Sequence, residues 1–332
     1  MTSATAWWDR HQVWLYVAAI AFGVVVGLVL PAAGPTLSLA TTPVLALLLF
    51  ATFLGVPLIE VGRAFRDIRF LGTVLVLNFL LVPLVAFGLS RFVADDRALL
   101  LGVLLVLLTP CVDYVIVFTG LACGARARLL AATPLLMLVQ IVLLPVYLWL
   151  FAGGAVVADI DIAPFAEAFL WIIVVPLAAA AIVQALARRH RIGRRIERFF
   201  AAAMVPLMMA TLAVVVGSQI ADVGAQAAAL ARLVPIYVGF LAIMLFAGLG
   251  TGRLARLPVP ETRALVFSGA TRNSLVVLPL ALALPASFAL TPLAVVTQTL
   301  VELVGMVVFL RVVPTLTRVT GRSSVRRARR GR

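Results

Sequence analysis

The sequence contains no lysine, so all 27 of its basic residues are arginines. A phosphate-binding loop needs a lysine in its G-x-x-x-x-G-K-[ST] motif, which excludes a nucleotide-driven pump of that class. A Schiff-base lysine of the retinal type is excluded for the same reason. Only two histidines occur, His11 and His190, and both flank or lie outside the long apolar runs. We therefore expect no histidine-built metal site and no cofactor.

Polar sequence is also scarce, since 64% of the residues are hydrophobic and only 12% are charged. This composition is typical of an all-α polytopic membrane protein, and no polar block is long enough for a separate soluble domain. Apolar runs of bilayer length recur ten times. They lie at 13–30, 41–59, 70–90, 98–121, 129–152, 164–187, 199–217, 233–252, 264–284 and 291–313.

The arginines are distributed unequally between alternate loops, which predicts the orientation. One set of loops holds the groups at 63–69, 126–128, 188–198 and 253–263, whereas the opposite set holds only Arg91, Arg97 and Arg232. We therefore expect both termini to be cytoplasmic, in the inner membrane of the cell. The net charge of +14 is then explained by this bias and by a basic tail at 318–332, which would meet anionic lipids rather than nucleic acid.

The stretch Thr109-Pro110-Cys111-Val112-Asp113 interrupts the fourth run with a proline, a thiol and a carboxylate. Pro110 removes a backbone hydrogen bond and breaks the helix, and a carboxylate at this depth costs roughly 2.5–3.5 kcal/mol. Such a break persists only where it is buried in protein or lines a cavity. The stretch is therefore a candidate site, with Cys111 as a small packing residue as the alternative.

An internal repeat relates the two halves of the chain. Thr-Pro-Leu opens both 133–140 and 291–298, and each ends in glutamine, Gln140 and Gln298, at an offset of 291 − 133 = 158. Five runs per half is an odd number, so the halves must be inserted in opposite senses. We expect a first five-helix repeat at 1–157, an inverted second repeat at 158–317 and the tail at 318–332.

The same offset predicts a second broken helix, in the ninth run. It carries 109–113 onto 267–271, beside the polar stretch 268–274 that contains Arg272. Asp113 and Arg272 fall at similar depths and could meet, either as a structural ion pair or as functional groups. Paired interruptions in corresponding runs are the best sequence indication of a transport site.

Several polar residues are candidates for this site. The functional interpretation makes Asp113 a proton or cation relay and Arg272 an anion clamp or the partner of Asp113. Gln298 and Glu302 share a helix face because they are four residues apart, and Glu302 is a second proton carrier. The remaining candidates are Gln140 near the coupling groups and Thr109, Asn273 and Ser274 at the substrate. For Asn78 an interhelical hydrogen bond is the preferred interpretation.

The fourth run, with its Pro110-Cys111 pair, resembles the signature of arsenite efflux permeases in the bile-acid/sodium symporter superfamily. The segment from Thr271-Arg272-Asn273-Ser274 through Pro279 is similar to the ninth span of the arsenic resistance proteins of that group. The resemblance implies two inverted five-helix repeats with broken helices 4 and 9. It also implies a core of helices 3–5 and 8–10 beside a panel of helices 1, 2, 6 and 7, with Cys111 important.

One departure from the resemblance concerns the coupling ion, because members with sodium coupling or well-studied arsenite coupling carry a glutamate in the ninth-span crossing and 268–274 has none. A proton on Asp113 or Glu302 is then favoured over sodium. We expect a secondary transporter that exports arsenite by exchange against protons. The alternative is a sodium- or proton-coupled transporter of a small organic anion, with Arg272 holding the carboxylate. A membrane enzyme is disfavoured because no catalytic dyad is present.

Overall fold

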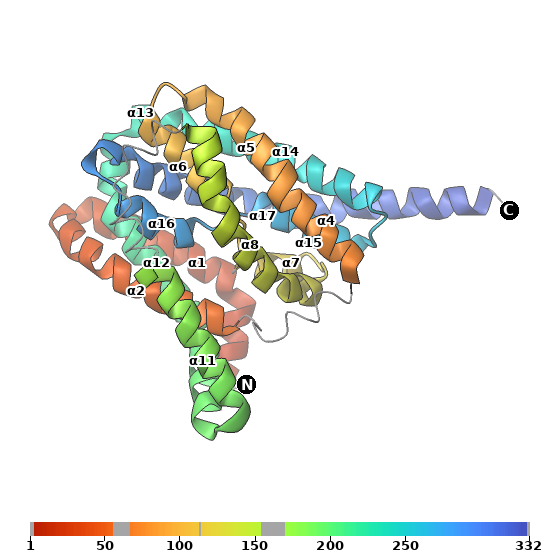
Figure 1. Cartoon of the computed structure of the whole chain (residues 1–332), viewed down its shortest axis with the longest axis horizontal. Coiled ribbons are helices and arrows are strands. Elements are labelled where there is room, and N and C mark those ends of the chain that lie inside the picture. Colours follow the sequence, from red (N-terminus) through yellow and green to blue (C-terminus); the bar gives the residue numbers. More distant parts are fainter. Residues whose placement is uncertain (1–2, 56–66, 113, 154–169, 331–332) are drawn as a thin grey trace. The chain divides into compact units, whose positions relative to one another are not determined.

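The computed structural model describes residues 3–55, 67–112, 114–153 and 170–330. Within these ranges every regular element is a helix, apart from one isolated β-bridge, which confirms the all-α prediction (Figure 1). Six helical segments of the described chain are long and apolar enough to cross a membrane. They are Gly34–Gly55, Ile68–Val93, Arg126–Ala152, Arg191–Ile220, Ala227–Leu254 and Leu290–Thr317.

The other four predicted runs are helical as well. Run 13–30 lies on α1 (Ser3–Val29), the described part of 164–187 lies on η6 (Leu170–Val174) and α11 (Val175–Arg189), and 98–121 and 264–284 lie on two short helices each. Each of the ten predicted runs therefore contains helix in its described part. That each run crosses the membrane remains a prediction.

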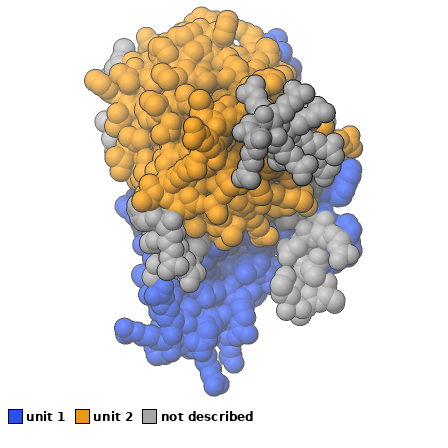
Figure 2. Space-filling model, turned by 90° about the vertical axis from the view of Figure 1, so that its right-hand side faces the viewer, with its two compact units in different colours: residues 1–59, 160–231, 275–296 blue, residues 60–159, 232–274, 297–332 orange. Residues whose placement is uncertain are grey.

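The chain folds into two compact units, which are coloured in Figure 2. Unit 1 comprises Met1–Ile59, Ile160–Ala231 and Leu275–Val296; unit 2 comprises Glu60–Asp159, Arg232–Ser274 and Thr297–Arg332. Unit 1 contains the expected panel and unit 2 most of the expected core. Unit 2 differs from the expected core in one segment, Leu275–Val296 of the ninth and tenth runs, which belongs to unit 1. Both units combine segments from both halves of the chain, so the sequence repeats are a separate division and stay a prediction.

Unit 1 is built around α12 (Arg191–Ala225), which packs against α1, α2 (Gly34–Gly55) and α11. Two glycines of α1 face α12 directly. A Cβ atom at Gly23 would lie 2.7 Å from the carbonyl oxygen of Ala213, and one at Gly27 would lie 2.5 Å from that of Gly217. No side chain fits at these distances, so the small-xxx-small spacing permits close helix packing. Unit 1 also holds η1 (Pro31–Ala33), α13 (Ala227–Ala231), η7 (Ala286–Phe288) and nearly all of α16 (Ser274–Leu282).

Unit 2 is organised around α15, which lies along α14 and also contacts α4, η4, α7 and α8. Its helices are α4 (Ile68–Val76), η4 (Leu77–Leu81), α5 (Val82–Ser90), η5 (Arg91–Val93), α6 (Arg97–Leu107), α7 (Tyr114–Leu121), α8 (Arg126–Ala152), α14 (Leu233–Leu254), α15 (Val259–Ala270) and the C-terminal part of α17 (Leu290–Arg330). Residues of the candidate site fall on several of these helices, so unit 2 is the part that positions it.

The third run contains a π-helical turn, η4, between α4 and α5. Pro83, just after this turn, has no N–H, so the carbonyl of Phe79 lacks its helical partner. The hydroxyl of Tyr147 on α8 donates to that carbonyl at 2.5 Å. Asn78 lies in the π-turn and is fully buried. The irregular turn is therefore supported from α8 and carries a polar side chain into the interior of unit 2.

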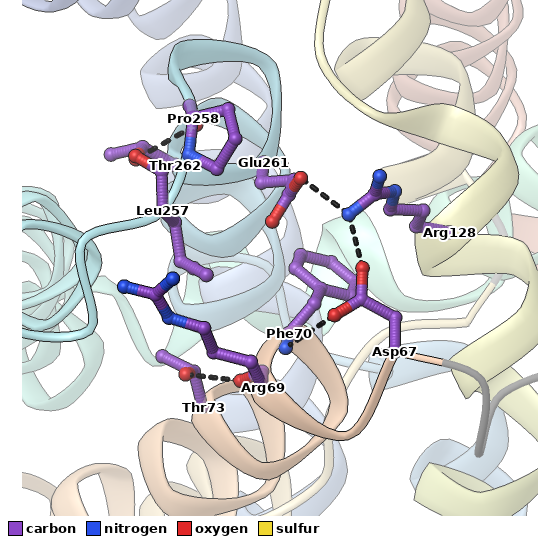
Figure 3. A network of polar contacts seen from close by, with 9 residues as sticks. All are labelled: Asp67, Arg69, Phe70, Thr73, Arg128, Leu257, Pro258, Glu261 and Thr262. Atoms are coloured by element: carbon purple, nitrogen blue, oxygen red, sulfur yellow. Dashed lines mark hydrogen bonds and ion pairs between the residues drawn. The ribbon is translucent and has the colours of Figure 1, made fainter.

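One end of unit 2 holds a polar network, which we call the end network: Asp67, Arg128 and Glu261 (Figure 3). Asp67 accepts a hydrogen bond from the backbone N–H of Phe70 at 3.1 Å and so caps α4. Arg128 of α8 forms ion pairs with both carboxylates, and Glu261 lies in the first turn of α15. The Arg128 side chain is 50% exposed. The end network thus joins the ends of three helices at the solvent-exposed boundary of the unit.

Candidate functional site

The fourth and ninth runs are both interrupted. In the fourth run α6 ends at Leu107 and α7 begins at Tyr114, which confirms the break predicted at Pro110. In the ninth run α15 ends at Ala270 and α16 begins at Ser274, so a break is also present in the predicted polar stretch.

The second break lies one helical turn later than the repeat offset predicts. Arg272 stands opposite Pro110, and 272 − 110 = 162 rather than 158. Residues 267–270, onto which the offset carried the break, are still helical. The physical reason is that this half-helix has no proline at the break. Its ladder continues until the N–H of Thr271 bonds to the carbonyl of Phe267 at 3.0 Å.

The two interrupted segments meet in an antiparallel bridge, which we call the crossing: residues 109–111 and 271–273. The N–H of Asn273 donates to the carbonyl of Thr109 at 2.8 Å, and the N–H of Cys111 donates to the carbonyl of Thr271 at 3.3 Å. The whole crossing is buried. Backbone groups that leave a helix in the protein interior need other partners, and here each segment supplies them to the other.

Arg272 is the largest fully buried side chain of the described residues. Its guanidinium donates to four protein oxygens: the carbonyls of Leu107 (3.3 Å), Ser268 (2.7 Å) and Gly269 (2.9 Å) and the side-chain oxygen of Asn78 (2.9 Å). The three carbonyls belong to the last turns of α6 and α15, where helices leave acceptors unpaired and carry partial negative charge. Arg272 therefore caps two half-helices at once, and none of these partners is a carboxylate.

Two further residues complete the surroundings of this guanidinium. Asn78 donates to the hydroxyl of Ser268 at 3.0 Å, so it links the π-turn to α15. This confirms the interhelical hydrogen bond predicted for it. The ring of Phe240 on α14 lies 5.6 Å from the guanidinium carbon, within the range of a cation–π contact.

Glu302 on α17 is 1% exposed and contacts the backbone of the crossing at Arg272. Its carboxylate accepts hydrogen bonds from the hydroxyl of Tyr114, the amide of Gln298 and the backbone N–H of Arg272, the last at 2.9 Å. The bond from Gln298 confirms that these two residues share a helix face. Glu302 thus binds the backbone of Arg272, while the guanidinium of Arg272 is bound elsewhere.

Tyr114 is the site residue that the sequence analysis missed. Its hydroxyl lies 3.0 Å from the carbonyl of Arg272 and also contacts Glu302, and a single hydroxyl hydrogen serves one acceptor at a time. The signal that could have found it is its position: Tyr114 is the first residue of the half-helix after the break and places a hydroxyl directly beside the predicted site.

Three buried polar atoms of this region have no protein partner: Nε of Arg272, the hydroxyl oxygen of Ser274 and Oε1 of Gln298. An unpaired buried polar atom costs about 1–3 kcal/mol, which favours a role in binding a polar solute or water. Cys111, also predicted here, is buried and is not part of a disulfide. The crossing thus offers a soft sulfur, one unpaired N–H of a guanidinium and the uncharged polar groups of Ser274 and Gln298.

The other two predicted coupling residues are Gln140 and Asp113. Gln140 is buried on α8, and its Oε1 has no partner. Among the residues that the structure describes, no hydrogen bond links it to the crossing. Asp113 lies outside the described residues. Its role as a relay and its ion pair with Arg272 therefore remain predictions.

Comparison with protein-family models identifies a matching family. The model of the Sodium Bile acid symporter family matches residues 42–226, which is more than half of the chain. The matched region includes Pro110 and Cys111 and ends before Arg272 and Glu302. No curated protein matches the sequence significantly.

Proposed function

The chain belongs to the sodium bile acid symporter family, and from this premise we propose that it exports arsenite across the inner membrane in exchange for protons. Members of the family are secondary transporters rather than enzymes, and they move small organic anions with sodium. Family membership together with the long apolar helices makes the chain a multi-pass membrane protein. The choice of arsenite and of protons rests on the geometry of the crossing.

The single observation that carries the choice of solute is that the guanidinium of Arg272 is already hydrogen-bonded to the protein itself. The guanidinium donates hydrogen bonds to four protein oxygens. Within the described residues, Arg272 is the only cation of the crossing. An organic carboxylate would find only the Nε–H of this guanidinium without a protein partner. Arsenite is uncharged at neutral pH and binds thiols, so it suits the buried thiol of Cys111 and the unpaired polar atoms of Ser274 and Gln298.

The proposed proton carrier is Glu302. A fully buried carboxylate joins α17, α7 and the break after α15 through three donors, and protonation would withdraw one of these acceptor positions. The state of Glu302 is thereby coupled to the geometry of the crossing. Asp113, which follows Cys111 by two residues, is the second candidate carrier.

Uptake of radiolabelled arsenite into everted membrane vesicles tests this proposal. With an acidic interior, wild-type vesicles should accumulate arsenite, and collapse of the pH gradient should abolish the accumulation. Cys111→Ser should remove it, whereas the matched control Cys123→Ser should leave it unchanged, because Cys123 is exposed and distant in sequence from the break. Equal accumulation by both variants would rule out the thiol as a solute ligand.

The organic-anion alternative is favoured by the family match alone. Taurocholate uptake in the same vesicles, driven by a sodium gradient, distinguishes it. We expect no sodium-driven uptake. Uptake of taurocholate without any transport of arsenite would replace the proposed solute by an organic anion.

We further propose the ten-span inverted plan, 1–157 and 158–317, with cytoplasmic termini and the tail 318–332 at anionic lipids. Single cysteines at Ile192 and Phe92, which are 65% and 71% exposed, should react from opposite sides, Ile192 from the cytoplasm. Gly193 is unsuitable for a label, because a Cβ there would lie 2.4 Å from the backbone nitrogen of Ala187. Reaction of both positions from one side would contradict the plan.

A further inference from the structure

The surroundings of Arg272 have the chemistry of a site for a free monovalent cation. Three backbone carbonyls and one amide oxygen, which we call the oxygen cage, converge on the guanidinium from Leu107, Ser268, Gly269 and Asn78. All four residues are buried. Carbonyl and amide oxygens are the ligands that hard cations take in proteins, and rings of carbonyls replace the hydration shell of alkali cations.

The electrostatics of the crossing require a cation at this position. The C-terminal turns of α6 and α15 both direct unpaired carbonyls to it, and each helix end carries about half a negative charge. The carboxylate of Glu302 adds to this, since it contacts the backbone of the same residue. A neutral group in the oxygen cage would leave these oxygens without donors in a buried place.

We infer that Arg272 is a tethered cation, whose guanidinium occupies the oxygen cage permanently in place of a cation from solution. The inference rests on the proposed function only in that the crossing is the transport site. It extends that function because it explains, by the side chain of Arg272, why the proposed transport does not depend on sodium. Removal of the side chain should convert the cage into a site for sodium or for free guanidinium.

The comparison with other arginines of unit 2 supports this assignment. Arg128 and Arg232 each pair with carboxylates and are about half exposed, as expected of ordinary ion pairs. Arg263 is buried on α15 and donates to the hydroxyl of Thr317 and to the carbonyl of Ala122, outside the crossing. Arg263 therefore provides a matched control, because it is a second buried arginine and lies on α15, the helix that precedes the break at Arg272.

Thermal unfolding of the full chain in detergent tests the inference without any transport measurement. Arg272→Ala should melt at least about 3 °C higher in sodium chloride or in dilute guanidinium chloride than in choline chloride of equal ionic strength, since a ligand that binds only the folded state raises the melting temperature. Guanidinium is used well below denaturing concentrations. Wild type and Arg263→Ala should melt at the same temperature in sodium and choline.

Arg272→Lys provides a second variant with a retained charge. Its ammonium should fill part of the oxygen cage and keep the melting temperature independent of sodium. Stabilisation of the wild type by sodium would overturn the inference, and so would an Arg272→Ala response equal to that of Arg263→Ala in all three salts. If Arg272→Ala does not fold in choline, recovery in sodium or guanidinium supports the cage, and failure in every salt contradicts it. Because the readout is binding, these outcomes are separate from any failure of proton-driven arsenite export.

Discussion

The end network and the crossing use the same types of side chain in opposite ways. At the end network, Arg128 is half exposed and forms ion pairs with two carboxylates, Asp67 and Glu261. At the crossing, Arg272 is fully buried and donates to backbone and amide oxygens, while Glu302 takes donors from other groups. At the end network an arginine is bound by ionised carboxylates, whereas at the crossing an arginine is bound by the carbonyl dipoles of helix ends.

The difference follows from the cost of burial. An exposed ion pair contributes only about 0.2–1 kcal/mol, and at the end network water can reach the half-exposed guanidinium of Arg128, although Glu261 is buried. A buried ion has a desolvation penalty of several kcal/mol and must be compensated by fixed groups. Because fixed dipoles compensate Arg272, Glu302 can gain or lose a proton without leaving the guanidinium unpaired. Under the proposed function, this separation of the two charges allows Glu302 to carry the proton.

The largest effect should come from removing the buried cation. Arg272→Met leaves four buried oxygens without their donor, each at a cost of about 1–3 kcal/mol, so we expect a loss of at least about 3 kcal/mol in the free energy of unfolding. Arg128→Met should lose at most about 1 kcal/mol. Denaturant unfolding of both variants in detergent measures the difference. Equal losses would show that the crossing is no more dependent on its arginine than the end network.

A smaller effect is expected at Tyr114. Tyr114→Phe leaves an oxygen of Glu302 and the carbonyl of Arg272 without that hydroxyl, which should cost about 1–3 kcal/mol of unfolding free energy. Proton-driven arsenite accumulation should also fall, because Glu302 loses its link to α7. Tyr237→Phe is the control for loss of a buried tyrosine hydroxyl outside the crossing. Unchanged accumulation in Tyr114→Phe would remove Tyr114 from the coupling machinery.

The support of the π-turn should have a still smaller effect. Tyr147→Phe leaves the carbonyl of Phe79 without a donor, so a loss of about 1 kcal/mol is expected. In a Pro83→Ala background the helix itself can supply an N–H to that carbonyl, and the same substitution should then cost little. A double-mutant cycle of thermal or denaturant unfolding measures this coupling. Additive losses would mean that Tyr147 does not compensate for Pro83.

The end network should give the smallest effect, visible as a pH dependence. Burial raises the pKa of the Glu261 carboxyl above its ordinary value of 4.5, and the charge of Arg128 offsets this in part. A raised pKa favours the protonated folded state, so this contribution to stability is present below pH 4.5 and is lost as the pH rises through the folded-state pKa. Glu261→Gln should remove this dependence. A variant that loses stability with rising pH just as the wild type does would contradict the assignment.

Local rules accounted for much of this fold. Pro110 specifies its helix break through the missing N–H, Gly23 and Gly27 specify close packing through the missing side chains, and the spacing of Gln298 and Glu302 specifies a shared face. Each of these follows from a residue type and a short distance along the chain.

The remaining features depend on backbone groups or on distant segments. The second break lies one turn beyond its predicted place because no proline marks it. The acceptors of Arg272 are mostly carbonyls, which every residue carries, so no sequence pattern could reveal them. Arg128 selects its two carboxylates only after α4, α8 and α15 have packed together.

The central claim is that the crossing and Glu302 carry proton-coupled transport while the end network only stabilises the fold. Arsenite accumulation in reconstituted liposomes under an imposed pH gradient, measured together with arsenite counterflow at equal pH, tests it directly. Wild type and Arg128→Gln should accumulate arsenite. Glu302→Gln should lose accumulation and keep counterflow, since it binds the solute without a titratable group. Accumulation by Glu302→Gln at the wild-type level would contradict the account.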